Sequence, residues 1–111
     1  MIYEATRYTV RPGALQACKE AVRELVEHVR EREEDTLLYV VMQEEEDDHR
    51  FLHLATFQDR ASRERHHASD AMRLFRDLVY PATVDGISTT ETTVVDRIPS
   101  RRTPRSAAAV R

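Results

Sequence analysis

The sequence is poor in glycine, cysteine and tryptophan, and each shortage excludes a class of site. Its 111 residues include two glycines, one cysteine and no tryptophan. Gly13 and Gly86 stand alone, so there is no glycine-rich loop to hold a dinucleotide or a triphosphate. The single thiol, Cys18, excludes an internal disulfide and a four-cysteine metal site. We therefore expect neither a cofactor nor a metal, and the simplest role for Cys18 is that of a small buried hydrophobe.

Long apolar runs and a basic body are also missing. No run approaches the ~20 apolar residues that cross a bilayer, and the first residues lack the basic start and apolar block of a signal peptide. We therefore expect a cytoplasmic protein with no membrane partner.

The charge is divided unevenly along the chain. Residues 1–95 contain 12 basic and 19 acidic residues, a net charge of −7, whereas residues 96–111 contain five basic and one acidic residue, a net charge of +4. An acidic body argues against nucleic-acid binding, because phosphates need a basic face. We expect one domain over residues 1–95. The flexible basic tail over residues 96–111 could bind RNA or an acidic partner, or be a solvated end.

Hydrophobic spacing predicts the order βαββαβ. Apolar residues recur every three or four positions over about residues 13–33, which predicts a long amphipathic helix. A second helical region starts at Asp59, breaks near Ala68 and Ser69, and ends at Pro81. Stretches over about residues 2–10, 36–44, 50–58 and 86–95 predict four strands. This order is that of the ferredoxin-like α+β fold, an antiparallel sheet with the first and third strands in the middle.

Two of the predicted strands are apolar on both faces. Residues 37–42 (LLYVVM) and 51–57 (FLHLATF) are apolar at nearly every position, whereas a sheet with one wet face should alternate apolar and polar residues. Two helices can cover only one face of the sheet. We therefore expect the other face to pack against the sheet of a second copy, which gives a homodimer. The acidic run at residues 44–48 between these strands predicts a solvated hairpin connection rather than a metal site.

The segment FQDRASRERHHAS, residues 57–69, follows a predicted strand and opens the broken helix. It has an aromatic residue at the strand end, an acidic residue, a small residue, and a histidine three positions before a serine. Together with Arg11-Pro12-Gly13 after the first strand and Leu38-Tyr39 in the second, it resembles the signature of the antibiotic biosynthesis monooxygenase family, the dimeric α+β barrels. The resemblance covers residues 2–95. It implies cofactor-independent oxidation, by O2, of a quinol or an aromatic polyketide-like small molecule.

Under this resemblance the catalytic base is a histidine, whose ordinary pKa lies near neutrality. His66 occupies the family's histidine position and is the first candidate; the alternative is a histidine on the helix surface. His53, within an apolar strand, is the second candidate, against the alternative of a hydrogen-bonded core histidine. We expect His67 to lie at the surface.

Aromatic and methionine side chains suit a flat polycyclic ligand. Tyr39 or Arg76 could orient a phenolate, although such an arginine could instead pair with acidic groups on the surface. The candidate lining residues, each of which could equally belong to an ordinary core, are Tyr8, Tyr39, Phe57, Met72, Phe75 and Tyr80.

Several positions depart from patterns within the family. Thr6, Phe57 and Arg76 stand where the haem-degrading branch has Asn, Trp and His, which disfavours haem degradation. Ala71 stands where many members carry a second histidine. These departures leave two alternatives to a monooxygenase: a non-catalytic ligand-binding or accessory dimer, and an isomerase or cyclase on the same fold, which would consume no oxygen.

Overall fold

The computed structural model describes residues 1–99 and 101. Their elements, in chain order, are β1 (Ile2–Val10), α1 (Leu15–Arg32), β2 (Thr36–Gln43), β3 (Arg50–Phe57), α2 (Arg60–Ala68), α3 (Asp70–Val79), the short 3-10 helix η1 (Tyr80–Ala82) and β4 (Thr83–Thr92). The predicted tail over residues 96–111 lies largely outside the described residues. Among those residues, no helix combines the length and the apolar character that crossing a membrane requires.

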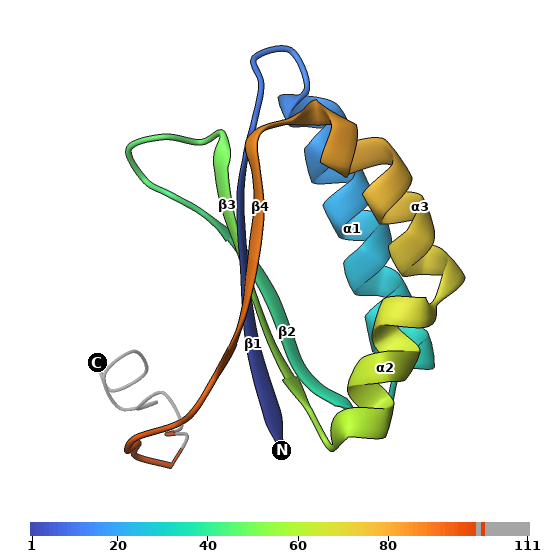
Figure 1. The fold of residues 1–111 in the computed structure, drawn as a ribbon, viewed down its shortest axis with the longest axis vertical. Coiled ribbons are helices and arrows are strands. Elements are labelled where there is room, and N and C mark those ends of the chain that lie inside the picture. The colour runs from blue at the N-terminus through green and yellow to red at the C-terminus, as the bar shows by residue number, and fades with distance from the viewer. Residues whose placement is uncertain (100, 102–111) are drawn as a thin grey trace, which may run out of the picture.

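The strands form one antiparallel sheet in the order β2-β3-β1-β4. The three α-helices lie together on one face of this sheet (Figure 1). The structure is therefore a ferredoxin-like α+β fold, and the prediction that β1 and β3 occupy the middle of the sheet is confirmed.

Local signals set the ends of the helices. Gly13 has a φ of +92°, which L side chains rarely adopt, and α1 begins two residues later. Asp59 caps α2 through a capping box with Ser62. Ser69 caps α3, because its hydroxyl accepts a hydrogen bond from the Met72 backbone N–H at 3.1 Å. The predicted break between these two helices is confirmed.

The last strand differs from its prediction at both ends. We predicted it over about residues 86–95, but β4 is Thr83–Thr92. Asp85 and Gly86, with φ of +62° and +78°, form an irregularity within the strand where the register with β1 shifts. Gly86 is therefore part of a bulge and not the start of the strand. At the other end Thr92 pairs with Tyr3, the second residue of β1. β4 ends there because β1 offers almost no further residues to pair with.

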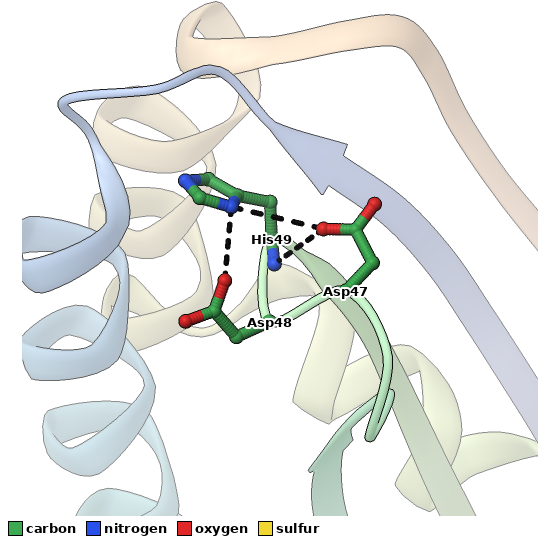
Figure 2. Close-up of side chains that lie close together, drawn as sticks. All are labelled: Asp47, Asp48 and His49. Atoms are coloured by element: carbon green, nitrogen blue, oxygen red, sulfur yellow. Dashed lines mark hydrogen bonds and ion pairs between the residues drawn. The ribbon is translucent and has the colours of Figure 1, made fainter.

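A charged hairpin joins β2 to β3 (Figure 2). His49 Nδ1 lies 3.0 Å from an oxygen of Asp48 and 3.7 Å from an oxygen of Asp47. The His49 backbone N–H also donates to Asp47 at 3.1 Å, and Arg50 Nε lies 3.4 Å from the other Asp47 oxygen. These contacts close the turn at exposed and half-buried positions, as expected for a solvated connection.

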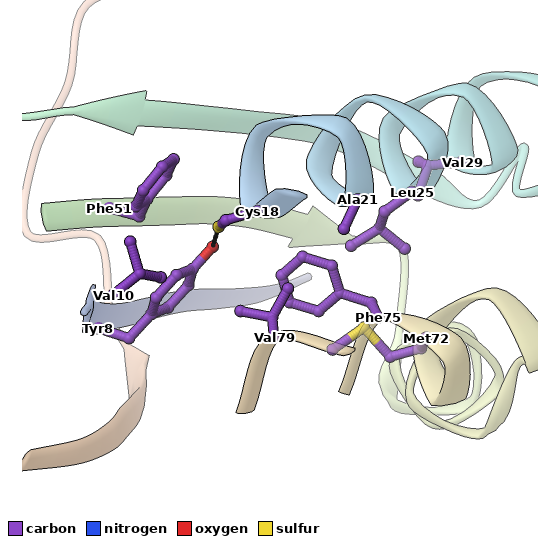
Figure 3. Close-up of a cluster of buried hydrophobic side chains, with 10 residues drawn as sticks. All are labelled: Tyr8, Val10, Cys18, Ala21, Leu25, Val29, Phe51, Met72, Phe75 and Val79. Atoms are coloured by element: carbon purple, nitrogen blue, oxygen red, sulfur yellow. Dashed lines mark hydrogen bonds between the residues drawn. The ribbon is translucent and has the colours of Figure 1, made fainter. Parts of the chain in front are cut away.

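The core lies between the helices and the inner face of the sheet. Figure 3 shows side chains of α1 and α3 meeting those of β1 and β3. Cys18 of α1 is 2 % exposed, and its sulfur lies 3.8 Å from the Tyr8 hydroxyl of β1. The prediction of a buried thiol is confirmed.

The outer face of the sheet has no described helix over it (Figure 1). Alternation along β2 and β3 places five apolar side chains on this face: Leu38, Val40, Met42, Leu52 and Leu54. Leu38 is 49 % exposed and Met42 is 40 % exposed. β2 and β3 are thus apolar on both faces, as their sequences predicted.

Candidate functional site

His53 forms a hydrogen-bonded triad with tyrosines of the two neighbouring strands. It lies in the middle of β3 and is buried. Its Nε2 lies 2.7 Å from the Tyr8 hydroxyl of β1, and its Nδ1 lies 2.8 Å from the Tyr39 hydroxyl of β2. Tyr8 is opposite Phe51 and Tyr39 is opposite Ala55, two residues to either side of His53. Diagonal neighbours of this kind are within reach of long side chains, so the register assembles the triad.

Burial keeps this triad uncharged at neutral pH. Desolvation, with a smaller contribution from nearby His66, lowers the pKa of His53 to about 4. Desolvation likewise raises the pKa of Tyr8 and the pKa of Tyr39. A neutral imidazole has one N–H donor and one acceptor nitrogen. One tyrosine therefore donates to His53 while the other accepts, and both ring nitrogens are engaged.

His66 of α2 forms a second pair, with the carboxylate of Glu33 at the end of α1. His66 is 2 % exposed, so the alternative of a helix-surface histidine is wrong. Its Nδ1 lies 2.8 Å from Glu33 Oε1, which also accepts a hydrogen bond from the Thr36 hydroxyl at 2.8 Å. The second oxygen, Oε2, is buried without a hydrogen bond, although His28 Nε2 lies 3.2 Å away.

The carboxylate of Glu33 is ionised in this setting. Burial by itself would raise the pKa of Glu33. The hydrogen bond and charge of His66 oppose this effect, and Thr36 and His28 add to the opposition, so that the pKa lies below its ordinary value of 4.5. A charged acceptor of this kind makes a hydrogen bond stronger than a neutral one does.

The next residue, His67, was predicted at the surface; it is half-buried and bonded to a different carboxylate. Its side chain is 29 % exposed, and its Nε2 lies 2.9 Å from an oxygen of Glu4, which is buried in β1. Arg63 Nε donates to the other Glu4 oxygen at 2.9 Å. Burial acts to raise the pKa of Glu4, but His67 and Arg63 lower it overall. The charged carboxylate on the inner face of the sheet holds His67 against that face.

Aromatic rings connect the two histidine sites. The centroid of the Tyr39 ring lies 5.7 Å from that of His53 and 5.2 Å from that of His66. Phe57, which is fully buried, lies 5.3 Å from His66, and Phe75 lies 5.4 Å from His53. Five of the predicted site residues therefore occupy one place between the sheet and the helices.

Two other predicted site residues, Met72 and Arg76, have different surroundings. Met72 is buried in the core beside Phe75 (Figure 3). Arg76 donates from Nη1 to the backbone carbonyl of His67 at 3.0 Å. Among the hydrogen bonds of the described residues, none joins Arg76 to Tyr39 or to either histidine ring of the cluster. Arg76, a residue of α3, thus links α3 to the end of α2 by a hydrogen bond.

Hollows on the surface reach the His66–Glu33 pair. One of about 620 Å³, between the end of α1 and α2, includes both residues in its wall together with Ser62 and Arg65. A second, of about 270 Å³, is lined by Tyr39 and Glu33 among others. An apolar groove of about 480 Å³ between α1 and α3 includes neither histidine. Of these three hollows, the first has His66 in its wall.

One group of side chains in residues 1–99 and 101 has the spacing of metal ligands. Asp47, Asp48 and His49 place one ligand atom each within 4.8 Å of one another (Figure 2). Their contacts with each other and with Arg50 already account for this arrangement as turn closure. We assign no metal site to it.

Sequence reasoning missed Glu33 and Glu4. Glu33 lies in the charged run at residues 31–34, which reads as a solvated helix end, and no sequence signal separates it from its neighbours. For Glu4 a signal existed. It shares the strand parity of Tyr8 and Val10, so alternation places it on the inner face of the sheet.

The ferredoxin-like α+β fold, with His53 and His66 buried between its sheet and its helices, is that of a monooxygenase-like protein that binds small molecules. The model of the antibiotic biosynthesis monooxygenase family matches residues 1–78, and the chain belongs to this family. No curated protein matches its sequence.

Solved structures share the fold. One described as an antibiotic biosynthesis monooxygenase has a TM-score of 0.81 at 22% identity, covering 86% of this chain and 100% of that one. A conserved protein from Methanosarcina mazei Go1 has a TM-score of 0.75 at 22% identity, covering 82% and 89%. A Pseudomonas aeruginosa protein has a TM-score of 0.75 at 23% identity, covering 86% and 94%. At these identities the likeness shows the fold alone.

Proposed function

We propose that this protein is a cofactor-independent monooxygenase that oxidises a quinol or an aromatic polyketide-like small molecule with O2. The observation that carries the proposal is the His66–Glu33 pair in the wall of the larger hollow. A histidine oriented by a carboxylate and set among aromatic rings suits proton removal from a phenol or an anthrone.

His66 suits the role of base better than His53. Both nitrogens of the His53 ring are engaged by tyrosine hydroxyls, and its pKa is lowered to about 4, which makes it a weak base. Glu33 engages only Nδ1 of His66. We assign proton removal to Nε2 of His66, and to His53 the task of holding Tyr39 in place to orient the substrate oxygen.

The chemistry balances without a bound cofactor. Removal of a proton from the acidic methylene of an anthrone leaves an electron-rich anion, which gives one electron to O2. The two radicals combine at that carbon, and loss of water then leaves a carbonyl group. One oxygen atom enters the substrate, and the other leaves as water with the two hydrogens of the methylene.

The test is oxygen uptake by chelator-treated protein with a panel of hydroquinones and an anthrone, corrected for spontaneous oxidation. His66→Gln should lower the rate by about 10²- to 10⁴-fold, the usual contribution of a general base. His49→Gln, in the hairpin between β2 and β3, is the matched control and should keep the full rate. Uptake that equals the blank in the unaltered protein, while the compounds still bind, would support the binding-protein or isomerase alternatives instead.

We also propose that two copies pack through the outer face of the sheet. The support is the apolar strip of β2 and β3 on that face, where Leu38 and Met42 are 49 % and 40 % exposed. Light scattering at micromolar concentration should give the mass of a dimer, and Leu38→Glu should give that of a monomer. Leu74→Glu, equally apolar and 63 % exposed but on α3, should leave the mass unchanged. A monomer in the unaltered protein would contradict the proposal.

A further inference from the structure

The geometry points to Glu33 as the positioning residue that fixes the orientation and the proton of the His66 ring. This inference rests on the proposed function, because it concerns the residue proposed there as the base. Glu33 lies 33 residues before His66 in the sequence and belongs to a different element, so the pairing is a product of the fold.

The backbone of Glu33 is fixed on both sides. Its N–H donates to the Val29 carbonyl at 3.0 Å, which closes the last turn of α1, and its own carbonyl accepts from the Thr36 N–H at 3.0 Å. The Thr36 hydroxyl then holds Oε1 at 2.8 Å. These contacts hold the carboxylate in place independently of His66, as positioning groups of catalytic residues need to be held.

The state of the carboxylate decides the state of the ring. An ionised carboxylate only accepts hydrogen bonds, so the proton in the 2.8 Å contact belongs to Nδ1 of His66. In the neutral ring this leaves Nε2 as the acceptor nitrogen. When Nε2 takes the proton of a substrate O–H or C–H bond, the bonding electron pair stays on the substrate. The resulting imidazolium then faces the negative charge of Glu33.

Other titratable groups around His66 do not perform this task. Tyr39 of β2 and His67 of α2 meet the His66 ring with centroids 5.2 and 5.3 Å away, and the charge of His66 acts on His53 of β3. None of them makes a hydrogen bond with His66 among those of the described residues. Glu33 is the one described group that holds an atom of the ring.

The Glu4–His67 pair is a built-in comparison. It also joins a buried carboxylate to a histidine of α2, at 2.9 Å. There, however, the carboxylate engages Nε2, and Arg63 neutralises it through the second oxygen. Glu4→Gln therefore makes the same chemical change as Glu33→Gln at the neighbouring histidine of the same helix.

The test is two-dimensional NMR of histidine-labelled protein, which shows directly which ring nitrogen carries the proton. The signals of His66 are identified by their disappearance in His66→Gln. In the unaltered protein His66 should carry its proton on Nδ1. In Glu33→Gln the form protonated on Nε2 should appear, because the amide can donate to Nδ1, whereas Glu4→Gln should leave the His66 signals in place. If Glu33→Gln fails to fold, the measurement on the unaltered protein decides: a His66 ring protonated on Nε2 would overturn the inference.

Kinetics separate a positioning role from a structural one. With a substrate that is turned over, Glu33→Gln should lower kcat at least tenfold with KM within about twofold, and it should move the acidic limb of the pH–rate profile to lower pH. Unchanged kcat and pH profile would overturn the inference even if oxygen is consumed. If no oxygen is consumed, the proposed function fails while the NMR result still confirms or overturns the role of Glu33.

Discussion

Acidification should destabilise the protein through His53. The pKa of this histidine falls from its ordinary 6.5 to about 4 on folding, because burial disfavours the charged ring. Between these values the unfolded chain binds a proton that the folded chain does not. The contribution of His53 to the free energy of unfolding is therefore fully present above pH 6.5, declines as the pH falls, and is gone once the pH is below about 4. At about 1.4 kcal/mol per pKa unit, the total loss is about 3 kcal/mol.

The measurement is the free energy of unfolding in urea between about pH 7.5 and about pH 4.5. Protein concentration is held fixed, because self-association would shift the transition. Stopping near pH 4.5 keeps the measurement above the pKa of Glu4 and of Glu33, each of which lies below its ordinary value of 4.5. His53→Gln is the matched variant, because an amide offers both a donor and an acceptor to the tyrosines and does not titrate.

The free energy of unfolding should fall more steeply with decreasing pH in the unaltered protein than in His53→Gln. About 2 kcal/mol of the decline seen in the unaltered protein should vanish in His53→Gln over this range. Equal slopes would refute the reasoning, because they would mean that the folded protein accepts a proton on His53 as readily as the unfolded chain does.

Two further predictions concern single hydrogen bonds, each measured by urea unfolding at neutral pH. Tyr8→Phe removes the hydroxyl 2.7 Å from His53 Nε2 and should cost about 1–3 kcal/mol, because a buried ring nitrogen loses its partner; an unchanged stability would show that the nitrogen is satisfied in another way. Ser69→Ala removes the cap of α3 and should cost about 1 kcal/mol, most of which Ser69→Thr should restore. Equal losses in Ala and Thr variants would contradict a capping role.

The parts of the fold that sequence predicted well are those governed by neighbours along the chain. The two caps, Asp59 and Ser69, act within three residues of themselves, so the helix break between them could be read directly. The predicted strand over about residues 86–95 began too late, because Asp85 and Gly86 form a bulge inside β4 and two more of its residues precede them. Whether a glycine ends a strand or bulges it depends on the partner strand, which the local sequence does not contain.

In the candidate site, too, the features set by local sequence could be predicted and those set by distant residues could not. The burial of His53 follows from its apolar strand, and the parity of that strand is a local property. The partners of His66 and His67 are not local: Glu33 and Glu4 lie 33 and 63 residues away. Glu33 looked like ordinary surface charge, and although the parity of β1 places Glu4 on the inner face, no local signal identifies the histidine partner of either carboxylate.

The adjacent histidines explain how α2 is attached to the rest of the protein. Side chains of consecutive helical residues point about 100° apart, and His66 and His67 accordingly reach two elements, α1 and β1. The buried residues of α2 are Ser62 and His66, so the helix buries little apolar surface. Its anchorage depends instead on charge-assisted hydrogen bonds to two carboxylates. The contact that holds this helix on the fold is therefore also the contact that sets the proposed base, and a change at Glu33 has to be judged on both effects.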